Sequence, residues 1–420
     1  MVDAHRTFVI VGGGLAGAKA AETLRAEGFT GRVILIGDER DHPYERPPLS
    51  KGYLSGKEER DSVFVHEPAW YARADVELHL GQTVVAIDRD AKSVRLGDGT
   101  VVHYDKLLLA TGAEPRRLDI PGTELAGVHH LRRLAHADRL RRVLAALGRD
   151  NGHLVIAGAG WIGLEVAAAA RGYGAEVTVV EPEATPLHQV IGPELGQVFT
   201  ELHREHGVRF HFGARLTEIS GQDGVVLAAR TDDGEEHPAH DVLAAIGAAP
   251  RTALAESAGL AMADRAHGGG IAVDASLRTS DPDIYAAGDV AAAHHPLLGS
   301  RLRVEHWANA LNGGPAAARA MLGQEVSYDR IPYFFSDQYD LGLEYSGWAP
   351  PGAYDQVVLR GDAQKRQFIA FWLKGRRVLA GMNVNVWDVT DPIQQLIRSG
   401  APVDPEALAD PSVPLTSLSG

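Results

Sequence analysis

The sequence predicts an α/β protein with two Rossmann-like dinucleotide-binding domains, followed by a smaller C-terminal α+β domain. A strand, a glycine turn and an alanine-rich helix follow one another near the N-terminus, and the same unit recurs from residue 153. From about residue 327 the segments become aromatic and alternating, which is typical of an antiparallel sheet. The 420 residues also exceed what one hydrophobic core usually supports.

The first unit begins with an apolar strand at residues 8–11 and continues into a helix at 16–27. Between them lies Gly12-x-Gly14-x-x-Gly17, in which the first glycine forms the turn, the second admits a pyrophosphate and the third lets helix and strand pack closely. Asp38 and Glu39 follow the next strand, at the distance expected for an acid that binds a ribose hydroxyl. This unit therefore predicts a nucleotide site.

The second unit has a strand at 153–157, the turn Gly158-x-Gly160-x-x-Gly163 and a helix at 164–172. Glu181 closes the following strand, 177–180, and no arginine comes directly after it. Because a carboxylate repels the 2′-phosphate of NADP, this site is expected to prefer NADH.

The rest of the chain fits around these units. Segments 83–87, 93–96 and 100–102 predict a small antiparallel insertion, and 224–229 predicts a matching strand after the second unit. The expected domains are a first dinucleotide-binding domain at 1–115 and 245–326, a second at 116–244, and an α+β domain at 327–420. The last twenty residues are expected to lie along the surface.

Composition excludes several kinds of function. With 41 basic and 55 acidic residues, a net charge of −14 argues against nucleic acid or a membrane as the main partner. No signal peptide or membrane span is recognisable, so a cytoplasmic protein is expected. The chain has no cysteine, which excludes thiol chemistry and thioether-linked cofactors. The 19 histidines suggest no metal site: His203 and His206 are expected on a solvated helix face, and His294 and His295 in a loop.

Further motifs carry a family resemblance. Segments 107–113 (LLLATGA) and 284–290 (IYAAGDV) resemble the paired sequences of the glutathione-reductase-like flavoproteins. Within that superfamily, ERPPLSK at 45–51, GAGWIGLE at 158–165, VEHWANA at 304–310 and SDQY at 336–339 resemble the NADH-dependent ferredoxin reductases of the putidaredoxin-reductase type. The resemblance covers essentially the whole chain.

That resemblance implies non-covalent FAD, NADH, and an iron–sulfur ferredoxin that supplies a cytochrome P450 or a ring-hydroxylating dioxygenase. Monomer or weak homodimer is expected. The residues implied for FAD are Gly12, Gly14, Leu15, Ala16, Gly17, Asp38, Glu39, Arg46, Pro47, Lys51, Val84, Ala110, Thr111, Gly112, Arg132, Asp289, Glu305, His306, Trp307 and Phe335. Those implied for NAD are Gly158, Gly160, Trp161, Ile162, Gly163, Glu165, Glu181, Ile246 and Gly247.

Lys51 and Glu165 are the predicted catalytic residues. An ion pair between them would place a cation beside the flavin and offset the charge that develops as hydride arrives. Phe335 stands where the family often has tryptophan, so it keeps an apolar face but lacks the indole N–H. Arg301 and Arg303 are expected to form a basic docking face for an acidic ferredoxin.

The absence of cysteine separates this chain from the disulfide- and peroxide-reducing relatives. Two alternatives remain open. One is reduction of monodehydroascorbate or rubredoxin. The other is a redox-responsive binding protein resembling apoptosis-inducing factor, in which turnover is slow.

Overall fold

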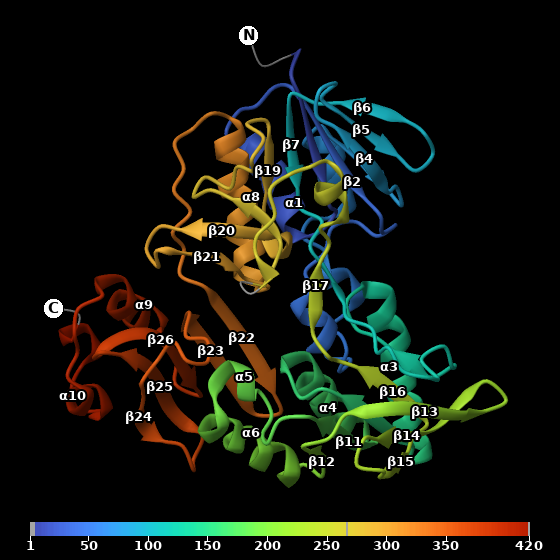
Figure 1. Cartoon of the computed structure of the whole chain (residues 1–420), viewed down its shortest axis with the longest axis vertical. Helices are drawn as coiled ribbons and strands as arrows, with labels where there is room; N and C mark the ends of the chain where they lie inside the picture. The colour runs from blue at the N-terminus through green and yellow to red at the C-terminus, as the bar shows by residue number, and fades with distance from the viewer. Residues whose placement is uncertain (1–4, 266–267, 419–420) are drawn as a thin grey trace. The chain divides into compact units, whose positions relative to one another are not determined.

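The structure is a computed structural model that describes residues 5–265 and 268–418. The chain divides into two compact units (Figure 1). Unit 1 is formed from Met1–Glu45, Asp61–Glu114 and Ala249–Pro332, and unit 2 from Arg46–Arg60, Pro115–Ala248 and Tyr333–Gly420. The predicted third domain thus falls in the same unit as the predicted NAD-binding domain.

Unit 1 is built on a five-stranded parallel sheet with the order β19-β7-β1-β2-β3. Its central strands are continuous apolar runs whose side chains are fully buried, as expected for a parallel sheet covered on both faces. The strands are β1 (Thr7–Val11), β2 (Arg32–Gly37), β3 (Val76–Leu80), β7 (Lys106–Leu109) and β19 (Ile284–Ala286).

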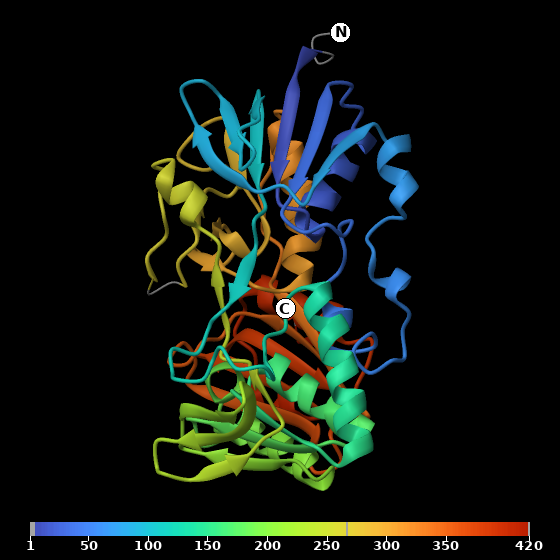
Figure 2. The ribbon, with the colours of Figure 1, turned by 90° about the vertical axis from the view of Figure 1, so that its right-hand side faces the viewer.

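Two helices of unit 1, α1 (Leu15–Ala26) and α8 (Trp307–Met321), pack closely against each other (Figure 1 and Figure 2). Gly314 of α8 lies directly on the backbone of Ala16 in α1, where an added Cβ would clash with the Ala16 carbonyl oxygen. The helix that follows the first glycine turn is therefore fixed to the helix that begins at Trp307.

Smaller elements complete unit 1. The predicted insertion is present as the antiparallel sheet β4 (Val84–Asp88), β5 (Ser93–Leu96) and β6 (Val101–His103). A second sheet contains β18 (Ile271–Val273), β20 (Ala291–His295) and β21 (Ser300–Arg303). The short helices are η3 (Arg60–Val63), α2 (Pro68–Arg73), α7 (Ala253–Ser257) and η5 (Gly288–Val290). Strands β8 (Ala113–Pro115) and β17 (Ala248–Pro250) pair where the chain passes between the units.

The first part of unit 2 repeats the parallel design, in the order β12-β11-β10-β16-β9. The strands are β9 (Val128–His129), β10 (His153–Ala157), β11 (Glu176–Glu181), β12 (Arg209–Phe212) and β16 (Asp241–Ala244). Its helices are η2 (Pro47–Ser50), α3 (Leu134–Asp150), α4 (Trp161–Tyr173), α5 (His188–Ile191) and α6 (Pro193–Glu205). An antiparallel sheet adds β13 (Leu216–Gln222), β14 (Val225–Thr231) and β15 (Glu236–Pro238), which confirms the predicted strand near 224–229.

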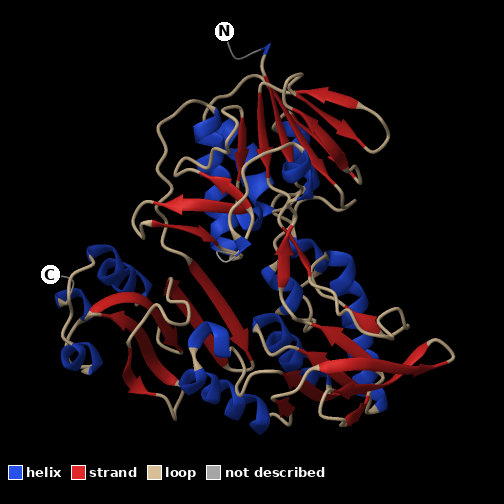
Figure 3. Cartoon of the chain, in the orientation of Figure 1, coloured by secondary structure: helices blue, strands red, loops and turns tan. Residues whose placement is uncertain are grey.

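The second part of unit 2 is a five-stranded antiparallel sheet in the order β22-β23-β26-β25-β24 (Figure 3). The strands are β22 (Tyr333–Gln338), β23 (Leu341–Gly347), β24 (Gln356–Asp362), β25 (Gln367–Lys374) and β26 (Arg377–Val384). Helices α9 (Thr390–Ser399), α10 (Pro405–Ala409) and η6 (Leu415–Ser417) follow. The sheet confirms the antiparallel α+β prediction for this segment.

The chain's end is held against β24. Arg360 donates to the backbone carbonyl oxygens of Leu408, Asp410, Pro411 and Val413. The segment around residues 408–413 therefore lies against β24. Among the described residues, no helix is both long and apolar enough to cross a membrane.

Candidate functional site

The first glycine turn, in unit 1, has three differently shaped positions. A Cβ at Gly12 would clash with the Ala110 carbonyl, and one at Gly17 with the Gly12 carbonyl. Gly12 also has a φ of 130°, which favours glycine. At Gly14, by contrast, a Cβ would meet nothing within 4 Å. The turn is thus closed by packing at its ends and open at its middle, next to the N-terminal residues Leu15 and Ala16 of α1, as an incoming pyrophosphate requires.

Two acids follow β2 in the same unit. Asp38 is ion-paired with Arg251 at 3.0 Å, and Glu39 accepts a hydrogen bond of 2.6 Å from the Tyr44 hydroxyl. Both carboxylates are therefore held in place beyond the carboxyl end of the strand. Thr111, in the segment Ala110–Gly112, donates to the carbonyl oxygen of Arg251 at 2.9 Å. These contacts connect the two loops that follow β2 and β7.

The remaining unit 1 candidates gather around the start of α8. Asp289 lies in η5. Arg303 donates to the carbonyl oxygen of Asp289 and forms an ion pair with Glu305, so it connects η5 to the segment just before α8. Burial lowers the pKa of His306, the N-cap of α8, to about 4, so this imidazole is neutral at pH 7. Trp307 Nε1 donates to Glu45 Oε2 at 3.1 Å, which fixes the indole.

The glycine turn of unit 2 repeats the first one position for position. A Cβ at Gly158 would clash with the Ala245 carbonyl and one at Gly163 with the Gly158 carbonyl, whereas at Gly160 nothing lies within 4 Å. Glu181 reaches the turn: its Oε2 accepts from the Ala159 N–H at 2.6 Å. The predicted ribose-reading acid therefore lies at the mouth of the turn.

Apolar side chains accompany this second turn. Ile162, in the first turn of α4, and Ile246, just before Gly247, are large apolar residues with 42% and 38% of their surface exposed. Trp161 instead packs its ring against Phe199 and Phe334, with centroids 5.7 and 5.1 Å away. Trp161 therefore anchors α4, and the two isoleucines offer an apolar surface.

The predicted ion pair between Lys51 and Glu165 is present in unit 2. Lys51 Nζ lies 2.8 Å from Glu165 Oε1, and the two side chains are 14% and 2% exposed. Glu165 also accepts hydrogen bonds from Ser50 Oγ and, at 2.6 Å, from Ser336 Oγ. These donors replace the water that a buried carboxylate loses and hold the carboxylate against the Lys51 ammonium.

The ammonium of Lys51 also lies 5.2 Å from the centroid of Phe335, within the range of a cation–π contact. Pro47 is the first residue of η2, which places Lys51 directly after the helix. Arg46 donates to the Arg132 carbonyl oxygen, which ties this segment to the loop before α3. Val84 lies in unit 1 as the first residue of β4.

The expectation that His203 lies on a solvated face is wrong. Its side chain is fully buried, Nε2 lies 2.8 Å from Gln338 Oε1, and burial lowers its pKa to about 4. His206, one turn away, is exposed and stacks on Tyr339 at 3.6 Å. His294 and His295 end strand β20 and so do not form a loop.

The structure gives Arg301 and Arg303, which were predicted to form a docking face, extensive contacts with the backbone. Arg301 Nη1 donates to the carbonyl oxygens of Val273 and Ala292, each at 2.6 Å. Arg303 is 10% exposed and donates to the Gly268 carbonyl in addition to the contacts described above. Both guanidinium groups hold the backbone around β21, so the two arginines have a structural role in addition to the proposed docking role.

Sequence reasoning missed Ser50 and Ser336 as the residues that hold Glu165. Both stood inside recognised motifs, and a buried acid requires hydrogen-bond donors. The need of a buried Glu165 for donors was therefore the signal that could have pointed to these serines. Their positions in η2 and in β22 could not be connected before the fold was known.

The comparisons with known proteins agree with this geometry. Residues 6–314 match the family model described as pyridine nucleotide-disulphide oxidoreductase, and residues 333–419 match the model of the reductase C-terminal domain. The chain is 40% identical to the ferredoxin–NAD(+) reductase component of the anthranilate 1,2-dioxygenase system of Burkholderia cepacia, over 98% of both chains. It is 38% identical to putidaredoxin reductase of Pseudomonas putida, over 99% of this chain and 97% of the relative.

Among solved structures, the covalent putidaredoxin reductase–putidaredoxin complex matches with a TM-score of 0.92 and 37% identity, covering 99% of this chain and 98% of that chain. The likeness to the two reductases covers nearly the whole chain, the C-terminal segment included. This chain therefore belongs to the pyridine nucleotide-disulphide oxidoreductase family, as a relative of the ferredoxin–NAD(+) reductases.

Proposed function

We propose that this protein is an NADH-dependent ferredoxin reductase that supplies electrons, through an iron–sulfur ferredoxin, to a cytochrome P450 or a ring-hydroxylating oxygenase. The observation that carries the proposal is the pair of glycine turns with the same shape in a chain similar to such reductases throughout its length. We assign FAD binding to residues 1–115 and 245–326 and NAD binding to 116–244. The cytoplasm, where NADH is supplied, is the proposed location.

The residues present fit both cofactors. Each turn leaves open space at its middle glycine and presents the N-terminus of a long helix, which is the arrangement that binds a pyrophosphate. In the first turn, Asp38 and Glu39 supply carboxylates for a ribose, and we propose that Asp289, Glu305, His306 and Trp307 serve the flavin end. In the second turn, Glu181 supplies the carboxylate. With no cysteine, the FAD would be bound non-covalently.

Bound FAD supplies hydride acceptance from NADH and release of the electrons one at a time. We propose that Lys51 positions a fixed positive charge beside the reacting ring, and that Glu165 orients the ammonium. Because the pair is almost dry, its field is screened less than it would be in water. Phe335 is proposed to pack its aromatic ring against the Lys51 ammonium.

The family includes enzymes that reduce disulfides, but this chain has no cysteine to take part in such a reaction. Electrons must therefore leave without a protein thiol, as reduction of a ferredoxin allows. Reduction of rubredoxin or monodehydroascorbate and a slow redox-responsive binding protein remain the alternatives.

The test is NADH-dependent reduction of a panel of purified acceptors by the yellow holoenzyme. We expect fast cytochrome c reduction that requires an added iron–sulfur ferredoxin, and release of FAD on denaturation. Activity with rubredoxin or monodehydroascorbate alone would favour the first alternative. Slow flavin reduction with tight retention of NAD would favour the second, and a colourless protein that cannot be reconstituted with FAD would contradict the proposal.

A further inference from the structure

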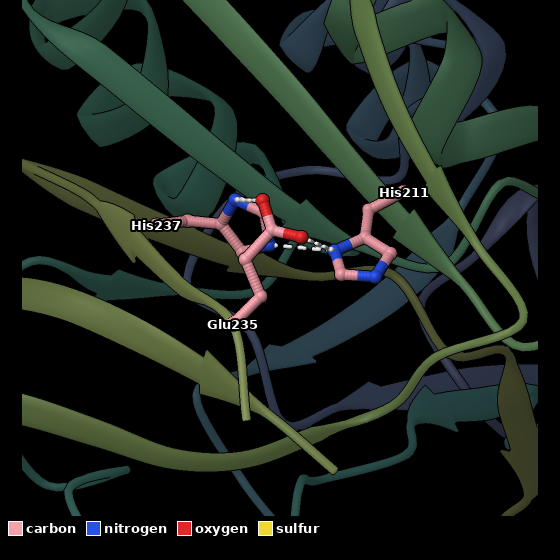
Figure 4. A group of neighbouring side chains, drawn as sticks. All are labelled: His211, Glu235 and His237. Atoms are coloured by element: carbon pink, nitrogen blue, oxygen red, sulfur yellow. Dashed lines mark hydrogen bonds and ion pairs between the residues drawn. The ribbon is translucent and has the colours of Figure 1, made fainter. Parts of the chain in front are cut away.

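A cluster of metal-ligating side chains lies in the NAD-binding part of unit 2, and the proposed electron transfer does not use it. His211 comes from β12, His237 from β15, and Glu235 from the turn that precedes β15. Figure 4 shows the three side chains pointing toward one another. The sequence suggested no metal site, because the two histidines lie 26 residues apart and belong to different sheets.

The possible ligand atoms are already close together. His211 Nδ1 lies 2.8 Å from His237 Nε2 and 3.4 Å from Glu235 Oε2. One ligand atom from each residue lies within 4.8 Å of the others. Two nitrogens bound to one tetrahedral Zn²⁺ lie about 3.3 Å apart, given Zn–N bonds of about 2.0 Å. The imidazoles would need to separate by only about half an ångström.

A further carboxylate orients His211. Its Nε2 lies 2.7 Å from Asp233 Oδ2, so the Nε2–H donates to Asp233 and the lone pair of Nδ1 faces the cluster. Asp233 is itself held by the Thr231 hydroxyl at 2.6 Å and by the Glu235 N–H at 3.3 Å. Metal-bound histidines commonly have such a carboxylate partner, which fixes the tautomer and raises the basicity of the ligand.

Burial and charge also suit a divalent ion. His237 is 8% exposed and the His211 side chain 14% exposed, whereas the Glu235 side chain is 61% exposed. Two ligands are therefore fixed and the third can move aside to admit an ion from solvent. The negative charges of Asp233 and Glu235 would balance the two positive charges of the ion.

We propose that His211, Glu235 and His237 form a binding site for a divalent transition metal, with Zn²⁺ as the best fit. Two imidazoles and one carboxylate are a common ligand set for zinc, with water in the fourth position. The ion would tie β12 of the parallel sheet to β15 of the three-stranded sheet. This inference does not rest on the proposed ferredoxin reduction.

The test is isothermal titration of ZnCl₂ into chelator-treated holoenzyme. We expect one site with a Kd in the micromolar range or below, together with a zinc-dependent rise in Tm. H211Q and H237Q should each weaken binding at least 100-fold and abolish the rise in Tm. D233N should weaken it about 10- to 100-fold, since it removes only the orienting carboxylate.

The matched control is H103Q, which alters an exposed strand histidine in unit 1 and should bind zinc like the wild type. If either histidine variant fails to fold, E235Q provides the test, because the Glu235 side chain is largely exposed and its replacement removes a ligand without opening the core. The proposal fails if the wild type does not bind zinc, or if H211Q and E235Q bind it as tightly as the wild type. In that case, the cluster is a hydrogen-bonded network only.

Discussion

Lys51 and Glu165 meet across 2.8 Å although they lie 114 residues apart. The Glu165 side chain is almost fully buried and accepts hydrogen bonds from two serine hydroxyls. The carboxylate is therefore held in place independently of the lysine. The pair is therefore a fixed charge arrangement, and its consequence for catalysis can be measured.

Replacing Lys51 by methionine is expected to slow flavin reduction by NADH roughly 10- to 100-fold while changing the Kd for NADH little. The physical reason is that the cation acts on charge that develops during transfer. Stopped-flow reduction over a range of NADH concentrations separates the two quantities. K57M, at an exposed lysine in the same segment, is the control. An unchanged limiting rate with weaker NADH binding would make Lys51 a binding residue.

The open middle positions of the two turns should respond differently from the closed ones. G14A has room for its methyl group, so the protein should fold but lose FAD, because the methyl occupies the approach of the pyrophosphate. G17A should destabilise the fold itself, because its Cβ clashes with the Gly12 carbonyl. G160A should retain FAD and weaken NADH binding. Flavin absorbance tests G14A, the Tm of the apoprotein tests G17A, and NADH titration tests G160A. Normal FAD content in G14A would refute the assignment of the first turn to the FAD pyrophosphate.

Glu181 should determine the preference for NADH. In E181Q/E183R the repelling carboxylate is lost and a guanidinium is gained nearby, so the ratio of kcat/KM for NADPH to that for NADH should rise about tenfold or more. E183R alone separates the two contributions. A wild-type preference for NADPH would show that another residue reads the ribose.

Burial of His203 should make the protein less stable in acid. Its pKa is about 4 in the folded protein against an ordinary 6.5, so the unfolded state binds more protons between these values. The free energy of unfolding should therefore fall by up to ~3 kcal/mol as the pH drops from 6.5 to 4, and change no further from this group below that. Denaturant titrations from pH 4 to 7 should show a smaller slope in H203Q but not in H206Q, which alters an exposed neighbour. Equal slopes in the wild type and H203Q would contradict the assignment.

The double variant R301E/R303E should lose ferredoxin-dependent and ferricyanide turnover together, along with several degrees of Tm. Both arginines hold backbone carbonyls around β21, so their loss disturbs the fold before it disturbs docking. R204E, at an exposed arginine of α6, should leave Tm unchanged. Loss of ferredoxin reduction alone would support the docking role.

Local signals were sufficient for much of this fold. The strand, glycine turn and helix at Gly12 and at Gly158 are encoded within short windows, so their positions and the separate roles of their glycines follow directly from the sequence. The ion pair of Lys51 and Glu165 was predicted from their positions, after the double proline and in the first turn of the second helix, together with the family resemblance. Its geometry depends on contacts between segments that no local pattern connects.

The errors arose where a distant strand decided the surroundings of a side chain. His203 looked solvated because its helix neighbours are charged, but Gln338 of β22 covers it. Arg303 was expected to lie free beside the VEHWANA segment, but its partners include carbonyls on other segments. The His211 cluster was missed for the same reason, since β12 and β15 meet only after the chain folds.

The close backbone contact of Gly314 with Ala16 fixes the spacing between α1 and α8 in unit 1. Because the two helices touch through backbone at that point, the glycine turn at the start of α1 and the indole at the start of α8 cannot drift apart without breaking it. We therefore expect a ligand that contacts both places to match this fixed spacing. Any side chain larger than hydrogen at position 314 would clash with the Ala16 carbonyl and so would change the spacing between the two helices.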